Sequence, residues 1–339
     1  MTHERELLEP VDLCTEDGAA LNPNACGWSR RPLHRCNLHG ELGRNKRWDY
    51  WAILAGDVVL SAVYSNVDYI GLADVWWADL RTGDHGGNGI GVPGGHGLVL
   101  PERPGTAPLN VEQGDFALHI VDDDGGTRLQ AQWTERDGRA GRLDVYVELP
   151  PDHETCNVVI PWSEREFNFT SKHQARPARG ELVVGDWSVA IGECDAWGVL
   201  DVGRGRWPSE IRWNWGGGAA RSGEHVIGLQ IGGKWTAGTG FTENAFTVDG
   251  RLTKLGRELE WRYDWDAPMG PWTVRDPGGQ LDMVLTPRFD KHTKVAGRKR
   301  GSETHQVFGT WSGRVVTDAG DLYEFSDAQG FAEEARQRW

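Results

Sequence analysis

The sequence lacks the pattern of a helical protein. Runs of helix-forming residues with a 3.6-residue apolar period are nearly absent, whereas glycine occurs 46 times in 339 residues, about twice its ordinary share. Short runs of aromatic and β-branched residues with period-two character lie between Gly, Asp and Asn breaks, which is typical of antiparallel strands joined by hairpins. We therefore predict an all-β fold with very few helices, built either as two compact units or as one large β-structure.

Positive charge and long apolar runs are also scarce. The chain has 36 Lys and Arg against 50 Asp and Glu, a net charge of −14, which disfavours nucleic acid or an anionic membrane as partner. The one basic cluster, residues 291–300, is short and interrupted by glycine, and we interpret it as a solvated loop. No stretch approaches the roughly 20 apolar residues of a spanning helix. Because the N-terminal sequence is charged as well, we expect a soluble, cytoplasmic protein.

Cysteine is too sparse and too irregular for a disulfide framework. The five positions are an odd number without regular spacing, which agrees with a reducing compartment: Cys14, Cys26, Cys36, Cys156 and Cys194. Cys26, His34, Cys36 and His39 form a loose cluster that could hold zinc, but the spacing matches no common zinc ribbon or finger. No metal site is predicted, and this cluster stays an open question.

Familiar catalytic motifs are missing too. The sequence contains no G-x-S-x-G elbow, no HExxH helix and no dinucleotide fingerprint followed by a helix, so hydrolase and oxidoreductase chemistry is disfavoured. The glycine-rich stretch 83–97 lacks the Gly-Lys-Ser/Thr ending and the following helix of a phosphate loop. We interpret it as a flexible hairpin loop or lid, and we predict no cofactor.

Tryptophan, in contrast, is abundant, with 18 residues. The stretch 211–250 concentrates Trp213, Trp215 and Trp235 in short strand-like runs. Alternate side chains of a strand share a face, so Trp213 and Trp215 lie together, and His225 aligns with the apolar residues that follow it at every second position. Such an aromatic face can wall a ligand cavity or form a core, and we take these three tryptophans and His225 as candidate ligand-binding residues.

A second candidate face runs through residues 58–68. Val59, Val63 and Val67 face one way, while Tyr64 and Asp68 face the other. The polar face is either exposed to solvent or a polar patch inside a ligand-binding barrel, where Asp68 could accept a proton and Tyr64 could donate a hydrogen bond.

The order of strand-like segments suggests three parts: a turn-rich N-terminal arm (residues 1–45), a first β-domain (46–205) and a second β-domain (206–339). The final segment GFAEEARQRW is interpreted as a last helical turn, with Phe331 and Trp339 as anchors.

Several separated motifs resemble one family. In order they are GWSRRPLHRCNL, KRWDYWAIL, SNVDYIGLADVWWADL, RWNW, TENAFTVDGRL, HQVFGTWSG and GFAEEARQRW. Between about residues 27 and 339 they look like the domain-of-unknown-function family 2804. That family is more distantly similar to the lipocalin-like group of carotenoid hydratase, tocopherol cyclase and Diels–Alderase proteins. The resemblance implies two lipocalin-like β-barrels or β-sandwiches in tandem, with a groove for an isoprenoid- or polyketide-like molecule. It carries over no catalytic residue.

Chemistry in an apolar groove needs an acid, and aromatic faces that stabilise cationic character. Our candidates for catalysis are Glu243, which lies among apolar residues, and His305. Asn244 and Gln306 are candidate ligand-binding neighbours. The alternative is structural: Glu243 and Asn244 cap a turn, and His305 is a satisfied strand histidine.

Three functions remain open at this stage. One is a cofactor-independent lyase or isomerase, of the hydratase or cyclase type, acting on a lipophilic substrate. Another is a non-catalytic carrier of such a molecule. The third is carbohydrate chemistry, in which Trp faces stack on sugars and Glu243 and Asp264 flank a glycosidic bond. The lining of the ligand pocket separates the third from the others, because a lipid groove is mainly apolar and a sugar cleft is open and polar.

Overall fold

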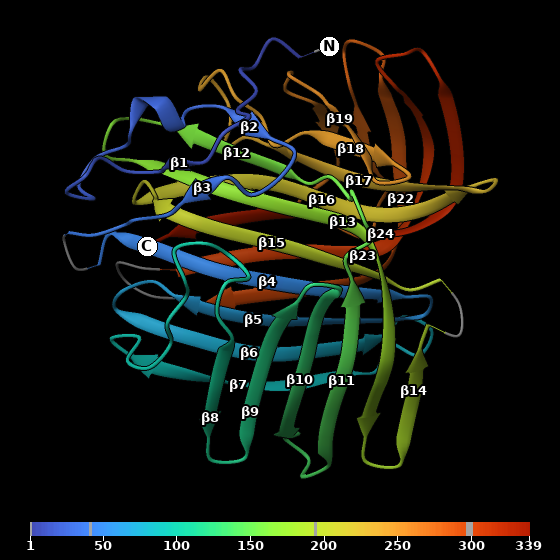
Figure 1. The fold of residues 1–339 in the computed structure, drawn as a ribbon. Helices are drawn as coiled ribbons and strands as arrows, with labels where there is room; N and C mark the ends of the chain where they lie inside the picture. The colour runs from blue at the N-terminus through green and yellow to red at the C-terminus, as the bar shows by residue number, and fades with distance from the viewer. Residues whose placement is uncertain (1, 41–42, 193–194, 296–300) are drawn as a thin grey trace.

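Antiparallel β-sheet makes up almost all of the computed structural model, which describes residues 2–40, 43–192, 195–295 and 301–339 (Figure 1). The all-β prediction is confirmed: within these ranges the only helical element is the 3-10 turn η1 (Pro23–Ala25). No helix of the described chain is long and apolar enough to cross a membrane. Two large sheets, one nearly closed like a barrel and one forming a half-barrel, follow each other in the sequence.

The first sheet has thirteen strands, and its main path runs in the order β7-β6-β5-β4-β15-β13-β11-β10-β9-β8. Its strands are β2 (Trp28–Ser29), β4 (Asn45–Ala55), β5 (Val58–Asn66), β6 (Ile70–Asp79), β7 (His85–Pro93), β8 (Leu109–Gln113), β9 (Phe116–Asp123), β10 (Gly126–Thr134), β11 (Ala140–Glu148), β12 (Cys156–Pro161), β13 (Phe167–Val184), β14 (Trp187–Ile191) and β15 (Trp197–Arg206). In Figure 1, β4–β7 run crosswise to β8–β11, so the sheet folds back on itself.

Contacts between β7 and the end of β10 bring the first sheet close to closure. Asn88 Nδ2 donates to Thr134 O at 2.8 Å, and the amide of Gly87 donates to Glu135 Oε2 at 2.9 Å. The crossed halves enclose one apolar core, with contributions such as Ile53 from β4 and Leu118 from β9. Alternation along each strand puts every second side chain into this core.

The second sheet has nine strands in the order β19-β18-β17-β16-β24-β23-β22-β21-β20. These strands are β16 (Glu210–Ser222), β17 (His225–Gly233), β18 (Ala245–Val248), β19 (Arg251–Lys254), β20 (Glu260–Arg262), β21 (Trp272–Arg275), β22 (Leu281–Val295), β23 (Gly301–Val316) and β24 (Leu322–Arg338). The apolar residues that align with His225 on β17, namely Ile227, Leu229 and Ile231, lie in its core.

Three local predictions are wrong. Residues 291–295 of the basic cluster are not a loop but the end of β22, and residues 296–300 of that cluster lie outside the described residues. The glycine-rich stretch 83–97 is not a loop but mostly the edge strand β7, in which glycine permits close packing: a Cβ on Gly87 would meet the carbonyl oxygen of Val75 at 2.1 Å. The segment after residue 330 is not helical but the end of β24, hydrogen-bonded on both sides to β16 and β23. Pairing with two neighbours overrides the helix propensity of its Glu, Ala and Arg residues.

The N-terminal residues lie against the first sheet. β1 (Val11–Asp12) and β3 (His34–Arg35) pair with each other. Leu13 and Leu38 of this region share a small apolar cluster with Phe167 and Phe169 of β13. The odd-numbered face at the start of β13 is thereby covered, and the even-numbered face is left for other contacts.

The two sheets pack directly against each other. Their contact cluster joins Ala52 and Leu54 of β4 with Trp215 of β16, Phe308 of β23 and Phe331 of β24. The outer face of β4 is therefore not a solvent face, and the space beside this cluster lies between the sheets.

Candidate active site

A cavity of about 670 Å³ opens between the two sheets. Its lining comes from the outward face of β4–β6, the start of β13, β15, and the strands β16 and β22–β24 of the second sheet. Its position follows from alternation: on β4, Trp48 and Tyr50 point into it, while Trp51 and Ile53 point into the first core. The cavity is thus separate from the core of either sheet.

Tryptophan forms much of its wall. The ring of Trp207, in the connection between the sheets, stacks on Trp235 with centroids 5.2 Å apart and planes 12° apart. The ring centroids of Trp48 and Trp213 lie 5.4 and 5.7 Å from the ring centroid of Trp207. Rigid rings in contact make an apolar wall whose π faces favour a neighbouring positive charge.

A buried ionic cluster lies in this wall. Lys172 Nζ lies 2.8 Å from Asp201 Oδ1 and 3.0 Å from Glu243 Oε2, and 4.7 Å from the ring centroid of Trp215. Burial lowers the pKa of Lys172, but the two carboxylates outweigh it and the net shift is upward, so the ammonium stays charged. Trp235 Nε1 donates to Glu243 Oε1 at 2.7 Å. Burial also raises the pKa of Glu243, against the opposing effect of Lys172.

Glu333 of β24 has a carboxyl group whose surroundings differ from those of Glu243. It lines the cavity, is almost fully buried, and accepts one hydrogen bond, from Trp213 Nε1 at 2.7 Å. Among the described residues, no cation lies within ion-pair distance of it. Burial raises the pKa of Glu333 to about 7, because the Trp213 hydrogen bond and the more distant Lys172 and Lys291 offset the loss of water only in part.

Several polar atoms of lining residues have no protein partner in the described chain. Both side-chain polar atoms of the buried Asn168 and the indole nitrogens of Trp207 and Trp339 belong to this group. Buried polar groups are normally hydrogen-bonded, so unpaired polar atoms in lining residues are an unusual feature of this cavity wall. By contrast, Gln306 Oε1 accepts from the Tyr50 hydroxyl at 3.2 Å.

The whole chain from residue 4 to residue 339 matches one family model, described as Domain of unknown function (DUF2804). The chain belongs to this family. The resemblance seen in the sequence motifs is thereby confirmed. No curated protein gives a significant match to it.

Several solved structures resemble this DUF2804 chain. Kievitone hydratase from Nectria haematococca has 12% identity and a TM-score of 0.46, covering 87% of this chain and 89% of its own. CghA with Sch210972 has 13% identity and a TM-score of 0.45 over the same shares of the two chains. An AttH-like protein from Nitrosomonas europaea has 13% identity and a TM-score of 0.49, covering 86% and 92%.

Half of the sequence-derived site residues of the DUF2804 chain meet in the cavity. The lining includes the following five candidates: Trp213, Trp215, Trp235, Glu243 and Gln306. Glu243 precedes β18 and reaches across to Lys172 of the first sheet. Trp213 and Trp215 lie on one face of β16, as the alternation predicts.

Four other candidates lie outside the cavity lining. Tyr64 packs in the first core and donates to Asn110 O at 3.3 Å. Asp68 accepts from the amides of Gly43 and Asn45, each at 2.9 Å. These contacts hold a turn and a strand in place, and ligand binding by Tyr64 and Asp68 stays a prediction.

Asn244 bridges backbone groups, accepting from the Gly232 amide at 2.6 Å and donating to Arg257 O at 2.9 Å. His225 is half exposed at the start of β17, where Nδ1 lies 2.6 Å from Asp249. Their roles in ligand binding also stay predictions.

His305, the second proposed catalytic residue, lies on the opposite face of β23 from Gln306. Its Nδ1 is 2.7 Å from Asp290 Oδ2, and it is not part of the cavity lining. His305 therefore does not line the cavity, and its catalytic role stays a prediction.

Sequence reasoning missed Lys172, Asp201 and Glu333. A signal for Lys172 existed, because Asn168, Thr170 and Lys172 alternate with Phe167 and Phe169. Glu333 was missed because its segment was interpreted as a helix. A helix does not direct two consecutive glutamates to opposite faces. Once β24 is a strand, Glu333 and Glu334 point to opposite sides.

The cysteine and histidine residues near the N-terminus do not gather as a metal-binding group within the described chain. His34 is buried with Nε2 at 2.9 Å from Ala25 O, and Cys36 is buried in the cluster beneath the N-terminal residues.

Proposed function

We propose that this protein is a cofactor-independent lyase or isomerase, of the hydratase or cyclase type, that acts on a lipophilic, isoprenoid- or polyketide-like substrate in the cavity between its sheets. The observation that carries the proposal is Glu333. A carboxyl group with a pKa of about 7 is half protonated near neutral pH, and general acids work best when their pKa lies near the operating pH.

The reaction needs no group beyond those in the wall. The protonated carboxyl of Glu333 gives its proton to a double-bond carbon or an oxygen of the substrate, and positive charge develops on the substrate. The rings of Trp213 and Trp215 face the same space and stabilise that charge. In hydration, water adds to the cation and returns a proton to Glu333. In isomerisation or cyclisation, a carbon next to the cationic centre loses a different proton to the Glu333 carboxylate, and a double bond forms.

Glu243 takes a different part. Because its carboxylate pairs with the ammonium of Lys172 at 3.0 Å, Glu243 is a poorer proton donor than Glu333, which has no such partner in the described chain. We propose that Glu243 and Asp201 hold Lys172 in place, and that Lys172 helps to keep the ionised Glu333 stable after proton transfer.

The substrate needs at least one polar atom. Asn168, Trp207 and Trp339 line the cavity and have buried polar atoms without a partner in the described chain. We propose that small side-chain rotations turn one of these atoms toward a polar atom of the substrate. Aromatic walls with a few polar atoms are typical of sites that bind a mainly apolar molecule and orient it through an oxygen. The same lining disfavours carbohydrate. Glu243 is buried and Asp264 is exposed and outside the lining, so they do not form the carboxylate pair of a glycosidase.

The test begins with the ligand. Protein purified from its own host is analysed by native mass spectrometry, and bound material is extracted into organic solvent and identified. We expect an oxygen-bearing isoprenoid or polyketide, and conversion of the extracted compound or its dehydrated form by the protein.

Glu333→Gln should then keep binding and lower turnover by about 10²- to 10⁴-fold, the usual contribution of a general acid. Glu324→Gln is the matched control, an exposed glutamate on the same strand. Full turnover by Glu333→Gln would rule out this acid. Binding without turnover by the unaltered protein would favour a carrier, and oligosaccharide binding alone would contradict the lipophilic proposal.

We also propose a cytoplasmic location. It is supported by the four cysteines in the described chain, all of which are free thiols, three of them buried.

A further inference from the structure

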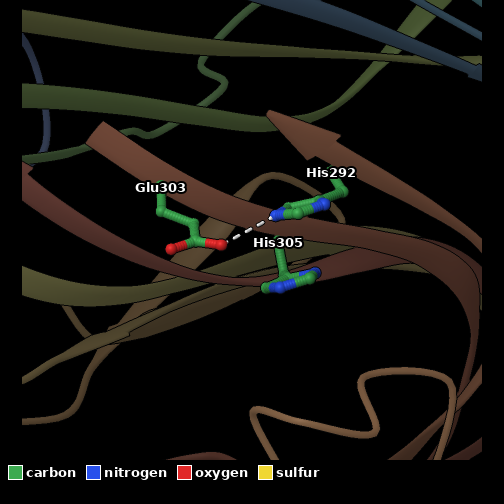
Figure 2. Close-up of side chains that lie close together, drawn as sticks. All are labelled: His292, Glu303 and His305. Atoms are coloured by element: carbon green, nitrogen blue, oxygen red, sulfur yellow. Dashed lines mark hydrogen bonds and ion pairs between the residues drawn. The ribbon is translucent and has the colours of Figure 1, made fainter. Parts of the chain in front are cut away.

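Two histidines and a glutamate meet on the β22–β23 ladder (Figure 2). His292 and His305 are direct cross-strand partners, and Glu303 precedes His305 by two positions on the same face of β23. One nitrogen of each ring and a carboxylate oxygen of Glu303 all lie within 4.8 Å of one another. Gln306 lines the cavity from the other face of β23, so this cluster is separate from the proposed active site.

The two histidine rings are stacked face to face. Their centroids are 4.2 Å apart with planes 3° apart, and Trp265 meets the His305 ring edge-on at 4.5 Å. A ladder of paired strands fixes the backbone beneath them, so only side-chain torsions separate the ligand atoms from a common centre. In a tetrahedral site two ligand atoms of one zinc ion lie about 3.4 Å apart. Because the ion lies in the plane of each imidazole that binds it, the stacked rings must rotate out of their parallel arrangement to share one ion.

Asp290 supplies the supporting contact that metal-binding histidines usually have. Its Oδ2 lies 2.7 Å from His305 Nδ1, and both residues are largely buried. With Nδ1–H donating to the carboxylate, His305 Nε2 carries the free lone pair. Such a carboxylate contact fixes the tautomer and increases the basicity of the metal-binding nitrogen.

We propose that His292, Glu303 and His305 bind a divalent transition-metal ion of the zinc class. Two imidazoles and one carboxylate are an established zinc ligand set, which leaves a fourth position for water. Lys294 Nζ lies 3.0 Å from the Glu303 carboxylate, and His292 Nε2 lies 3.1 Å from it. The ammonium of Lys294 is therefore a built-in competitor that the metal ion must displace.

The test uses full-length protein freed of metal by dialysis against a chelator. ZnCl₂ is titrated in competition with a chromophoric chelator, and CoCl₂ is added in parallel to read the coordination from its visible absorption. We expect one equivalent to bind. His292→Ala and Glu303→Gln should each lower the affinity at least about tenfold, and Asp290→Asn about 10- to 100-fold through its contact with His305.

Lys294→Ala gives the sharpest outcome, because removal of the competing ammonium should raise the zinc affinity. A purely structural role for the stacked histidines gives no such increase. The matched control is His119→Ala, since His119 forms a similar exposed pair with Glu112 at 3.3 Å but has no second histidine. Absence of stoichiometric binding, or binding that His292→Ala leaves unchanged, would overturn the proposal. Neither result bears on turnover in the cavity.

Discussion

In the described chain three buried glutamates accept hydrogen bonds from tryptophan indoles, and two of them, Glu135 and Glu333, have no cation within ion-pair distance. These two differ in what surrounds them. Glu135, at the edge of the first core, accepts from Trp77 at 2.7 Å, from Trp133 at 2.8 Å and from the Gly87 amide at 2.9 Å. Within the described chain the Glu333 carboxyl group accepts from Trp213 alone, and Glu333 lines the cavity. Three donors fix the carboxylate of Glu135 as part of the structure. One donor beside an open space leaves Glu333 able to gain and lose a proton.

The largest change in stability should come from removing the charge of Lys172, the buried cation in the cavity wall. Lys172→Met leaves Asp201 and Glu243 buried without their partner, and breaking such a pair costs about 3–5 kcal/mol. Urea unfolding followed by tryptophan fluorescence measures the loss. The triple variant that also carries Asp201→Asn and Glu243→Gln should recover much of it. Equal stability of the single variant and the unaltered protein would show that the cluster is not a buried ion pair in solution.

The next predicted effect is a gain in stability, and its size depends on pH. Burial raises the pKa of Glu333 from 4.5 to about 7, so the folded state binds more protons than the unfolded state between these values. Stability from this group is complete below pH 4.5 and falls as the pH rises to about 7. Glu333→Gln removes the cost of ionisation, and should stabilise the protein by up to about 3 kcal/mol at pH 8 and by little at pH 4.5. Urea unfolding at the two pH values checks this, and an equal effect at both would contradict it.

Glu135→Gln should act in the reverse direction. The amide oxygen can replace Oε1, which accepts from both indoles, but the amide NH₂ in place of Oε2 leaves the Gly87 N–H without an acceptor, at a cost of about 1–3 kcal/mol. The same unfolding assay measures it, and binding of the co-purified ligand should be unchanged. If Glu135→Gln weakened ligand binding as much as stability, the distinction between a structural and a reactive carboxylate would fail.

The smallest predicted effect is a shift in the pKa of Glu333 when its tryptophan donor is replaced. Trp213→Phe removes the only hydrogen bond that the Glu333 carboxyl group accepts within the described chain, and that bond lowers the pKa of Glu333. The pKa should therefore rise, by about one unit or less. Infrared spectroscopy of the protonated carboxyl band across a pH series measures the midpoint. A downward shift would mean that the cavity, and not the indole, supplies the stabilising contact.

The fold could be predicted much further than the site. Period-two alternation was sufficient for an all-β chain and for placing Trp213 and Trp215 on one face, because that information is local. The meeting of Lys172 with Glu243 was not accessible, since it depends on how one sheet packs on the other. Glu333 was missed because its Glu, Ala and Arg neighbours favour helix on their own. Only pairing with β16 and β23 makes that segment a strand and directs Glu333 into the cavity.

Lys172 also couples the evolution of the two sheets. Its partner Asp201 lies on β15 of the first sheet, and its partner Glu243 lies just before β18 of the second sheet. A substitution that removes the charge at position 243 leaves the buried ammonium of Lys172 with Asp201 as its single ion-pair partner in the described chain, so the change is tolerated best when position 172 changes with it. Within the family, positions 172, 201 and 243 should vary as a unit, and neither half can be exchanged for its counterpart from a distant relative without carrying that unit along.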